Sequence, residues 1–196
     1  MSLLEINGLC KRYPTFFLDG ISLKIDGGCV TGLIGRNGAG KTTLIKSMLN
    51  LVHPTSGSVR IFGMELTKHE TEIKQRIGYA SGSVGYYRRK KLKDIAKVTR
   101  TFYRNWDDGL YRTYLSRFSL DENKTPDQLS EGMKVKFNLA LALSHRAELL
   151  ILDEHTAALD PKTSENIMRL TDKMVCEKGI TTLMVTHNLR FAAEYG

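Results

Sequence analysis

Apolar and polar positions along the chain follow two different periods. Short apolar or alternating runs are typical of strands, and turn residues such as Asp26-Gly27-Gly28 interrupt them. We predict strands at residues 3–9, 21–25, 30–34, 58–62, 77–80, 149–152 and 180–185. Longer stretches with apolar residues three or four positions apart predict helices at residues 43–51, 70–76, 92–103, 110–118, 134–146 and 163–177.

Strands that alternate with helices predict an α/β fold, because a buried, mostly parallel sheet needs helices on both faces. The length of 196 residues suits a single domain, residues 1–196, with ample core. Residues 84–129 are rich in helix signals and poor in strand signals. We therefore expect a helical subdomain there, inserted into a core formed by residues 1–83 and 130–196.

A glycine-rich loop, residues 35–42, follows the predicted strand 30–34 and precedes the predicted helix 43–51. Its glycines let the backbone amides turn inward, and a helix N-terminus attracts an anion. In this pattern Lys41 reaches the β and γ phosphates and Thr42 holds Mg²⁺. The residues expected to contact the phosphates are Gly35, Arg36, Asn37, Gly38, Ala39, Gly40, Lys41, Thr42 and Thr43. We call residues 35–42 the phosphate loop.

A second group of chemical residues follows the apolar run 149–152, where Asp153 and Glu154 stand side by side. Open α/β sheets bind ligands at the carboxyl ends of their strands. Asp153 is expected to hold the magnesium ion, usually through water, and Glu154 to act as general base toward the attacking water. Together with Lys41 and Thr42, these acids predict a nucleoside triphosphate hydrolysis site.

Composition narrows the class of protein. No window holds the eighteen apolar residues that a membrane span needs, and the N-terminus has no basic region before an apolar stretch. Cys10, Cys29 and Cys176 are far apart, which favours reduced thiols over a disulfide framework or a metal cluster. We expect a protein that is neither secreted nor embedded in a bilayer.

The formal net charge of +8 is concentrated in one segment. Residues 86–104 contain eight cationic side chains and a single acidic one, Asp94. This segment alone therefore carries a formal charge of +7. The cationic residues are Arg88, Arg89, Lys90, Lys91, Lys93, Lys97, Arg100 and Arg104. Such a basic segment suits anionic lipid, acidic protein loops or nucleic acid, or is simply a solvated helix face.

Residues 129–134, Leu-Ser-Glu-Gly-Met-Lys, lie between the phosphate loop and the strand that ends in Asp153 and Glu154. Together these three motifs indicate a family resemblance. The order of phosphate loop, Leu-Ser-x-Gly at a helix start, and apolar strand ending in Asp-Glu resembles the ATP-binding cassette of ABC transporters. The resemblance covers essentially the whole chain. It implies a P-loop NTPase core of RecA-like type, with a small antiparallel β subdomain and an inserted helical subdomain.

The resemblance also implies roles for further residues. Tyr13 matches the aromatic that stacks on adenine, and Asp160 belongs to a loop at the dimer interface. His187 matches the switch histidine that contacts the γ phosphate. Ser130 and Gly132 of one subunit are expected to close over the ATP held by another. In this scheme ATP and Mg²⁺ are bound between two cassettes, as a homodimer or a heterodimer.

Separate transmembrane subunits would then be driven by the hydrolysis cycle. The resemblance thus places the chain at the cytoplasmic face of the membrane, as a peripheral subunit, or in the cytoplasm when it is unassembled. Residues 102–107 are similar to a segment of Gram-positive bacterial exporter ATPases. The basic segment, which falls in the helical subdomain, is expected to serve docking or lipid contact.

Several positions depart from the family pattern. Glu131 and Met133 replace residues of the usual Leu-Ser-Gly-Gly-Gln signature, and His155 replaces the usual proline after the catalytic glutamate. The glutamine normally found after Ile77-Gly78-Tyr79 is missing, because residues 80–83 read Ala-Ser-Gly-Ser. The chain also ends soon after His187, which we interpret as a truncated C-terminal end. These departures bear on the affinity for nucleotide and on the rate of hydrolysis more than on membership of the family.

Two alternatives remain open at this point. One is a soluble ABC protein that acts on nucleic acid or ribosomes; it is disfavoured because there is one cassette and only 89 positions separate Lys41 from Ser130, too few for a long coiled coil. The other is a weakly hydrolytic regulatory module, motivated by the altered signature and missing glutamine. Retention of Glu154 argues against it.

Overall fold

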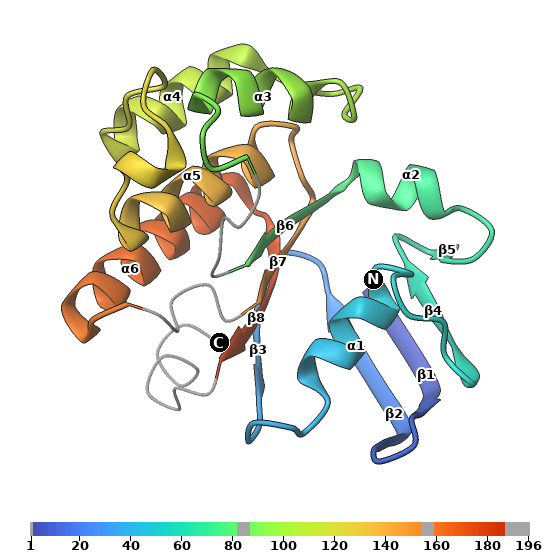
Figure 1. Cartoon of the computed structure of the whole chain (residues 1–196). Coiled ribbons are helices and arrows are strands. Elements are labelled where there is room, and N and C mark those ends of the chain that lie inside the picture. Colours follow the sequence, from blue (N-terminus) through green and yellow to red (C-terminus); the bar gives the residue numbers. More distant parts are fainter. Residues whose placement is uncertain (1, 82–86, 154–158, 187–196) are drawn as a thin grey trace.

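The computed structural model describes residues 2–81, 87–153 and 159–186, which form two sheets and the helices around them (Figure 1). The strands are β1 (Ser2–Arg12), β2 (Phe17–Asp26), β3 (Val30–Ile34), β4 (Ser56–Ile61), β5 (Met64–Glu65), β6 (Ile77–Ser81), β7 (Leu149–Asp153) and β8 (Thr181–Thr186). The helices are α1 (Lys41–Met48), α2 (Glu70–Gln75), α3 (Leu92–Arg100), α4 (Asp108–Phe118), α5 (Glu131–Leu143) and α6 (Pro161–Lys178). A 3-10 turn spans Pro126–Gln128.

One of the two sheets is parallel, with strand order β3-β8-β7-β6. Ile34 pairs with Thr186, and Asp153 pairs with both Val185 and Ser81. The last residues of all four strands therefore meet at one edge of the sheet. This confirms the predicted parallel sheet and brings the strand ends that carry the candidate chemistry together.

A second, antiparallel sheet has the order β2-β1-β4-β5. It confirms the antiparallel β subdomain. At one point two of its strands approach so closely that a Cβ on Gly57 would lie 2.4 Å from the carbonyl oxygen of Gly8. Gly57 also has a φ of +89°, so only glycine satisfies both the backbone and the contact.

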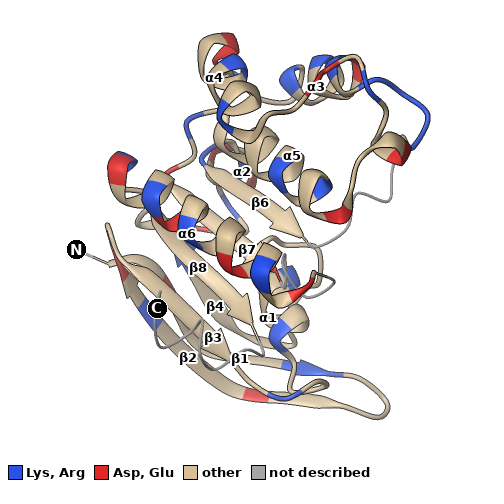
Figure 2. Cartoon of the chain, turned by 90° about the vertical axis from the view of Figure 1, so that its left-hand side faces the viewer, with Lys and Arg blue, Asp and Glu red and all other residues tan. Residues whose placement is uncertain are grey.

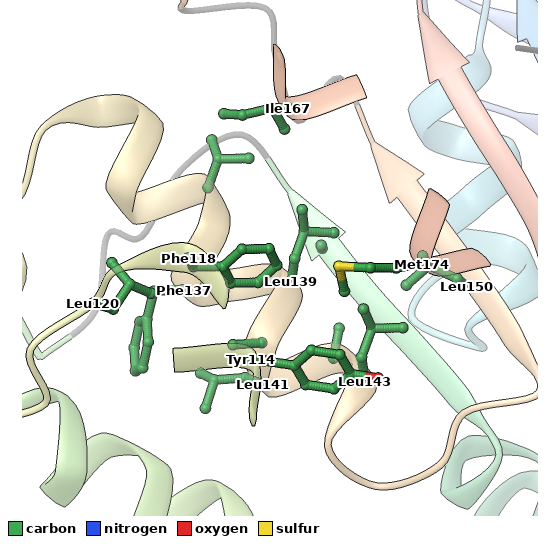
Figure 3. Close-up of a cluster of buried hydrophobic side chains, with 14 of the residues drawn as sticks. Tyr114, Phe118, Leu120, Phe137, Leu139, Leu141, Leu143, Leu150, Ile167 and Met174 are labelled. Atoms are coloured by element: carbon green, nitrogen blue, oxygen red, sulfur yellow. The ribbon is translucent and has the colours of Figure 1, made fainter. Parts of the chain in front are cut away.

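Both faces of the parallel sheet are buried, each in its own core. Leu150 and Leu152 of β7 point toward α5 and α6, in the cluster that Figure 3 draws in part, whereas Leu149 and Ile151 point toward α1 and the antiparallel sheet. This alternation follows from the two-residue period of a strand. Helices α5 and α6 consequently cover the face opposite to α1 (Figure 1).

Several element boundaries differ from the predicted ones. The first two strands extend to Arg12 and back to Phe17, because these two residues pair with each other at the end of a long hairpin. The predicted helix 134–146 begins three residues earlier, at Glu131, because Ser130 caps it. The short strand β5 and the 3-10 turn had no clear periodic signal. Within the described ranges, no helix is both long and apolar enough to cross a bilayer.

Candidate functional site

The phosphate loop connects β3 to α1 at the carboxyl edge of the parallel sheet. Gly38 and Gly40 have φ values of +82° and +93°, a region that residues with a side chain rarely adopt. A Cβ on Gly40 would also lie 2.7 Å from the ring of Phe16 and 2.9 Å from Leu18. These two glycines allow the loop to curl tightly in front of the N-terminus of α1.

Lys41 is the first residue of α1 and is 8% exposed. Its ammonium group donates hydrogen bonds to the carbonyl oxygens of Gly35, at 2.7 Å, and Arg36, at 3.2 Å. A hollow of about 560 Å³ opens over the same loop and is lined by Phe16 and residues 37–43. A buried cation and a helix N-terminus at the floor of an open hollow form an anion site.

Phe16 was missed in the sequence analysis, which assigned the aromatic contact to Tyr13. Tyr13 is 37% exposed, its ring centroid lies 6.4 Å from that of Phe16, and its backbone N–H donates to the Phe16 carbonyl oxygen at 2.7 Å. Of these two aromatics only Phe16 lines the hollow. The consecutive aromatics at 16 and 17 were a signal for a second ring near the site. The adenine contact of Tyr13 stays a prediction.

Asp153 ends β7 at the same edge, and a tyrosine of the neighbouring strand holds its carboxylate. The Tyr79 hydroxyl donates a hydrogen bond to Asp153 Oδ2 at 3.2 Å. Burial, and then the negative charge of Asp153, raise the pKa of Tyr79 to about 12, so it remains a donor at neutral pH. Both residues belong to the face of the sheet that α1 covers, because they alternate in step with Ile77 and Ile151.

The oxygen atoms available as ligands near this edge of the sheet suit a magnesium ion. Thr42 supplies a hydroxyl from α1 and Asp153 a carboxylate from β7, and Mg²⁺ prefers hard oxygen ligands. In the part of the chain that the structure describes, no three His, Cys, Asp or Glu side chains gather closely enough to hold a metal by themselves. Mg²⁺ usually keeps several waters and takes phosphate oxygens as further ligands.

The predicted signature residues lie on the other face of the sheet. Exposed Ser130 is the N-cap of α5, and its hydroxyl accepts a hydrogen bond from the Met133 backbone N–H at 3.3 Å. Gly132 is buried against α6, where a Cβ would lie 2.9 Å from Thr163 Cγ2. Because α5 and α1 pack on opposite faces, the structure does not bring Ser130 and Lys41 to one face.

Asp160 is the N-cap of α6, and its Oδ1 accepts a hydrogen bond from the Thr163 backbone N–H at 3.0 Å. Hydrogen bonds from Thr163, through its side chain first and its backbone second, hold the pKa of Asp160 below its usual value. This gives Asp160 a definite structural role. Glu154 and His187 follow the strand-end residues Asp153 and Thr186 directly and lie outside the described residues, as does His155, so the roles predicted for Glu154 and His187 stay predictions.

Comparison with known proteins agrees with this arrangement. The family model described as ABC transporter matches residues 18–157. The chain is 34% identical to the phosphonates import ATP-binding protein PhnC 2 of Synechococcus sp., over 97% of this chain and 78% of that protein. It is 36% identical to the bacitracin transport ATP-binding protein BcrA of Bacillus licheniformis, over 96% of this chain and 62% of that protein.

Solved structures give the same result. The structure of cbiO1 from Clostridium perfringens, part of the ABC transporter complex cbiONQ, superposes with a TM-score of 0.84 at 26% identity. The match covers 99% of this chain and 82% of the cbiO1 chain. A phosphate loop, a carboxylate at the end of β7 on the same sheet edge, and a capped signature helix are thus all found in a chain that matches the family along most of its length. The chain belongs to the ABC transporter family, as an ATP-binding domain.

Proposed function

We propose that this chain binds MgATP, hydrolyses it, and thereby powers transport by separate transmembrane subunits. The observation that carries the proposal is the hollow over the phosphate loop, which Lys41 helps to line, and the two loop carbonyls that hold the Lys41 ammonium. Lys41 and the loop amides bind the phosphates, and Phe16 closes one side of the hollow. When Mg²⁺ is bound beside Thr42 and Asp153, it neutralises charge on the phosphate oxygens.

Hydrolysis needs a base next to this site. We assign that role to Glu154, because it follows Asp153 directly, and the γ-phosphate contact to His187, because it follows Thr186 of β8 directly. A positioned general base contributes about 10² to 10⁴ in rate. Positioning and charge neutralisation by Lys41 supply most of the rest.

The active unit is proposed to contain two cassettes. The phosphate loop leads into α1, and the exposed Ser130 caps α5. These two helices cover opposite faces of one sheet. Ser130 is therefore better placed to contact nucleotide on a second chain, which is either a copy of this one or a related cassette. For Gly132, which is buried against α6, the same contact is proposed from the family resemblance alone. Asp160, at the start of α6, is proposed to lie in the same interface.

The basic segment is proposed to meet the transmembrane subunits at the inner face of the membrane. Figure 2 shows Lys and Arg along α3 and the loop before it. Part of this charge is compensated from outside the segment, since Arg100 lies 2.8 Å from Asp108 and Arg88 lies 3.9 Å from Asp127. Both pairs are exposed and therefore weak, so the segment keeps most of its positive potential. The reported relatives carry transport names, which favours this partner over nucleic acid.

Calorimetric titration with MgATP tests binding, and phosphate release tests hydrolysis. We expect Glu154→Gln to lose turnover while light scattering detects an ATP-dependent dimer. Glu72→Gln, on the exposed part of α2, is the matched control and is expected to behave like the parent protein. Well-folded parent protein that takes up no MgATP would contradict the proposal. Turnover by Glu154→Gln at the parent rate would remove Glu154 from the role of base.

A further inference from the structure

We propose that Tyr79 is a positioning residue that orients the Asp153 carboxylate for the metal ion through the hydrogen bond between its hydroxyl and Asp153 Oδ2. The inference rests on the proposed function, since it concerns the magnesium that accompanies ATP. It adds a residue that neither the motifs nor the family comparison singles out. The direct observation is the O–O distance of 3.2 Å between these two side chains.

The geometry of the sheet explains why this pair forms. Ser81 of β6 is the register partner of Asp153, and Tyr79 precedes Ser81 by two residues on the same face. A tyrosine is long enough to reach diagonally along the sheet from that position to the end of the neighbouring strand. The contact therefore spans β6 and β7, whose parallel pairing fixes where the hydroxyl sits relative to the carboxylate.

The contact also has a chemical consequence. An ionised carboxylate has about four lone-pair directions, and one hydrogen bond occupies one of them while fixing the rotation of the group. Carboxylates that ligate metals are generally held in this way by a second hydrogen-bonding partner. The hydroxyl of Tyr79 thus orients Asp153 Oδ2 from β6, the strand that pairs with β7.

One feature makes a purely structural role for Tyr79 the weaker explanation. The residue is 41% exposed, so the ring contributes only part of its area to the core.

Manganese binding measured by electron paramagnetic resonance tests the role without turnover. Mn²⁺ replaces Mg²⁺, and a non-hydrolysable ATP analogue occupies the site. We expect Tyr79→Phe to weaken Mn²⁺ binding to the protein–nucleotide complex about ten-fold, the usual effect of removing a hydrogen-bonding partner of a ligand. Nucleotide affinity without metal should stay at the parent value. Tyr87→Phe, an exposed tyrosine outside this contact, is the matched control and should leave both affinities unchanged.

A second comparison separates a positioning role from a loss of stability. If Tyr79 acts through Asp153, then Tyr79→Phe should change Mn²⁺ affinity no further in a protein that already carries Asp153→Asn. Equal Mn²⁺ affinity of Tyr79→Phe and parent, or a full ten-fold effect in the Asp153→Asn background, would overturn the inference. Failure of the parent protein to bind the nucleotide would instead overturn the proposed function.

Discussion

The ammonium group of Lys41 lies 2.7 Å from the carbonyl oxygen of Gly35, the first residue of the phosphate loop. The loop thus closes on its own lysine and holds a buried positive charge under an open hollow. A charged donor in this position gains more from phosphate oxygens than from neutral carbonyls. The loop therefore holds its lysine beside the hollow that we propose for the phosphates.

Lys41→Ala should weaken ATP binding about 10- to 100-fold. A charge-assisted hydrogen bond contributes about 1.5–3 kcal/mol, and the variant loses it. Titration calorimetry measures the affinity. Lys46→Ala, exposed in the last turn of the same helix, is the control and should bind ATP like the parent. Equal affinities of the two variants would show that Lys41 does not contact the phosphates.

Gly132→Ala should destabilise the protein through the contact between α5 and α6. A Cβ at this position would lie 2.9 Å from Thr163 Cγ2, and overpacking costs about 1–3 kcal/mol. Alanine returns about 1 kcal/mol of helix propensity, so we expect a net loss of about 1 kcal/mol in the free energy of unfolding. Urea unfolding measures it.

Thr163→Ser removes the Cγ2 methyl and keeps the hydroxyl, so it supplies the matched test of this contact. The double variant should be at least as stable as Thr163→Ser alone. If Gly132→Ala costs as much stability in the Thr163→Ser background as it does in the parent protein, the cause lies somewhere other than the Thr163 methyl group.

Gly78→Ala should destabilise the protein by about 3 kcal/mol or prevent folding. Its Cβ would lie 2.5 Å from the backbone carbonyl oxygen of Ala142, which cannot move unless α5 shifts away from β6. Gly27→Ala is the control, because its nearest atom is Leu3 Cδ1 at 4.0 Å. Thermal unfolding followed by circular dichroism should place the control near the parent. Similar transition temperatures for both variants would contradict the packing of β6 against α5.

Stability should fall below about pH 6.5 because of His145. The ring is buried, stacks on Tyr103 at 3.7 Å, and has its Nε2 3.0 Å from the Ile77 carbonyl oxygen. Burial lowers the pKa of His145, so between its ordinary value and the lowered one the unfolded chain binds a proton that the folded chain does not. Unfolding is therefore favoured as pH falls through this range, by at most about 1.4 kcal/mol per pH unit from this group.

Urea unfolding at pH 7 and pH 5.5 measures the effect. His145→Phe keeps a ring beside Tyr103 and should lose less stability than the parent between these two pH values, even if its stability at pH 7 is lower. His53→Gln, which changes an exposed histidine, should show the parent dependence. An unchanged pH dependence in His145→Phe would assign the effect to other groups.

Local signals were enough to locate most of the elements. The strand at Val30–Ile34 has the predicted bounds because a short apolar run between a glycine turn and a glycine loop leaves little choice. The start of α5 at Glu131 was placed three residues late, because its first turn contains a charged residue and a glycine and the dense apolar run begins only at Val135. Capping by Ser130 decided that boundary.

The residues of the candidate site also fall into those that local patterns predicted and those that they did not. Lys41 and Asp153 were predicted from motifs, because a phosphate loop and a strand-end carboxylate follow fixed local patterns. Phe16 and Tyr79 were not, because their roles depend on which strand or loop they meet. Phe16 lines the hollow only because the hairpin of β1 and β2 returns to the phosphate loop, and Tyr79 meets Asp153 only because β6 and β7 pair.

The amino-acid sequence alone determined the α/β class, the family, and the residues of the phosphate loop, since these depend on spacing along the chain. The tertiary structure alone decided that Ser130 and Lys41 lie on opposite faces of one sheet, and that Gly78 and Gly132 are limited by neighbouring helices. The physical reason is that the order of strands in a sheet and the close packing of helices on it bring together residues that local patterns treat independently.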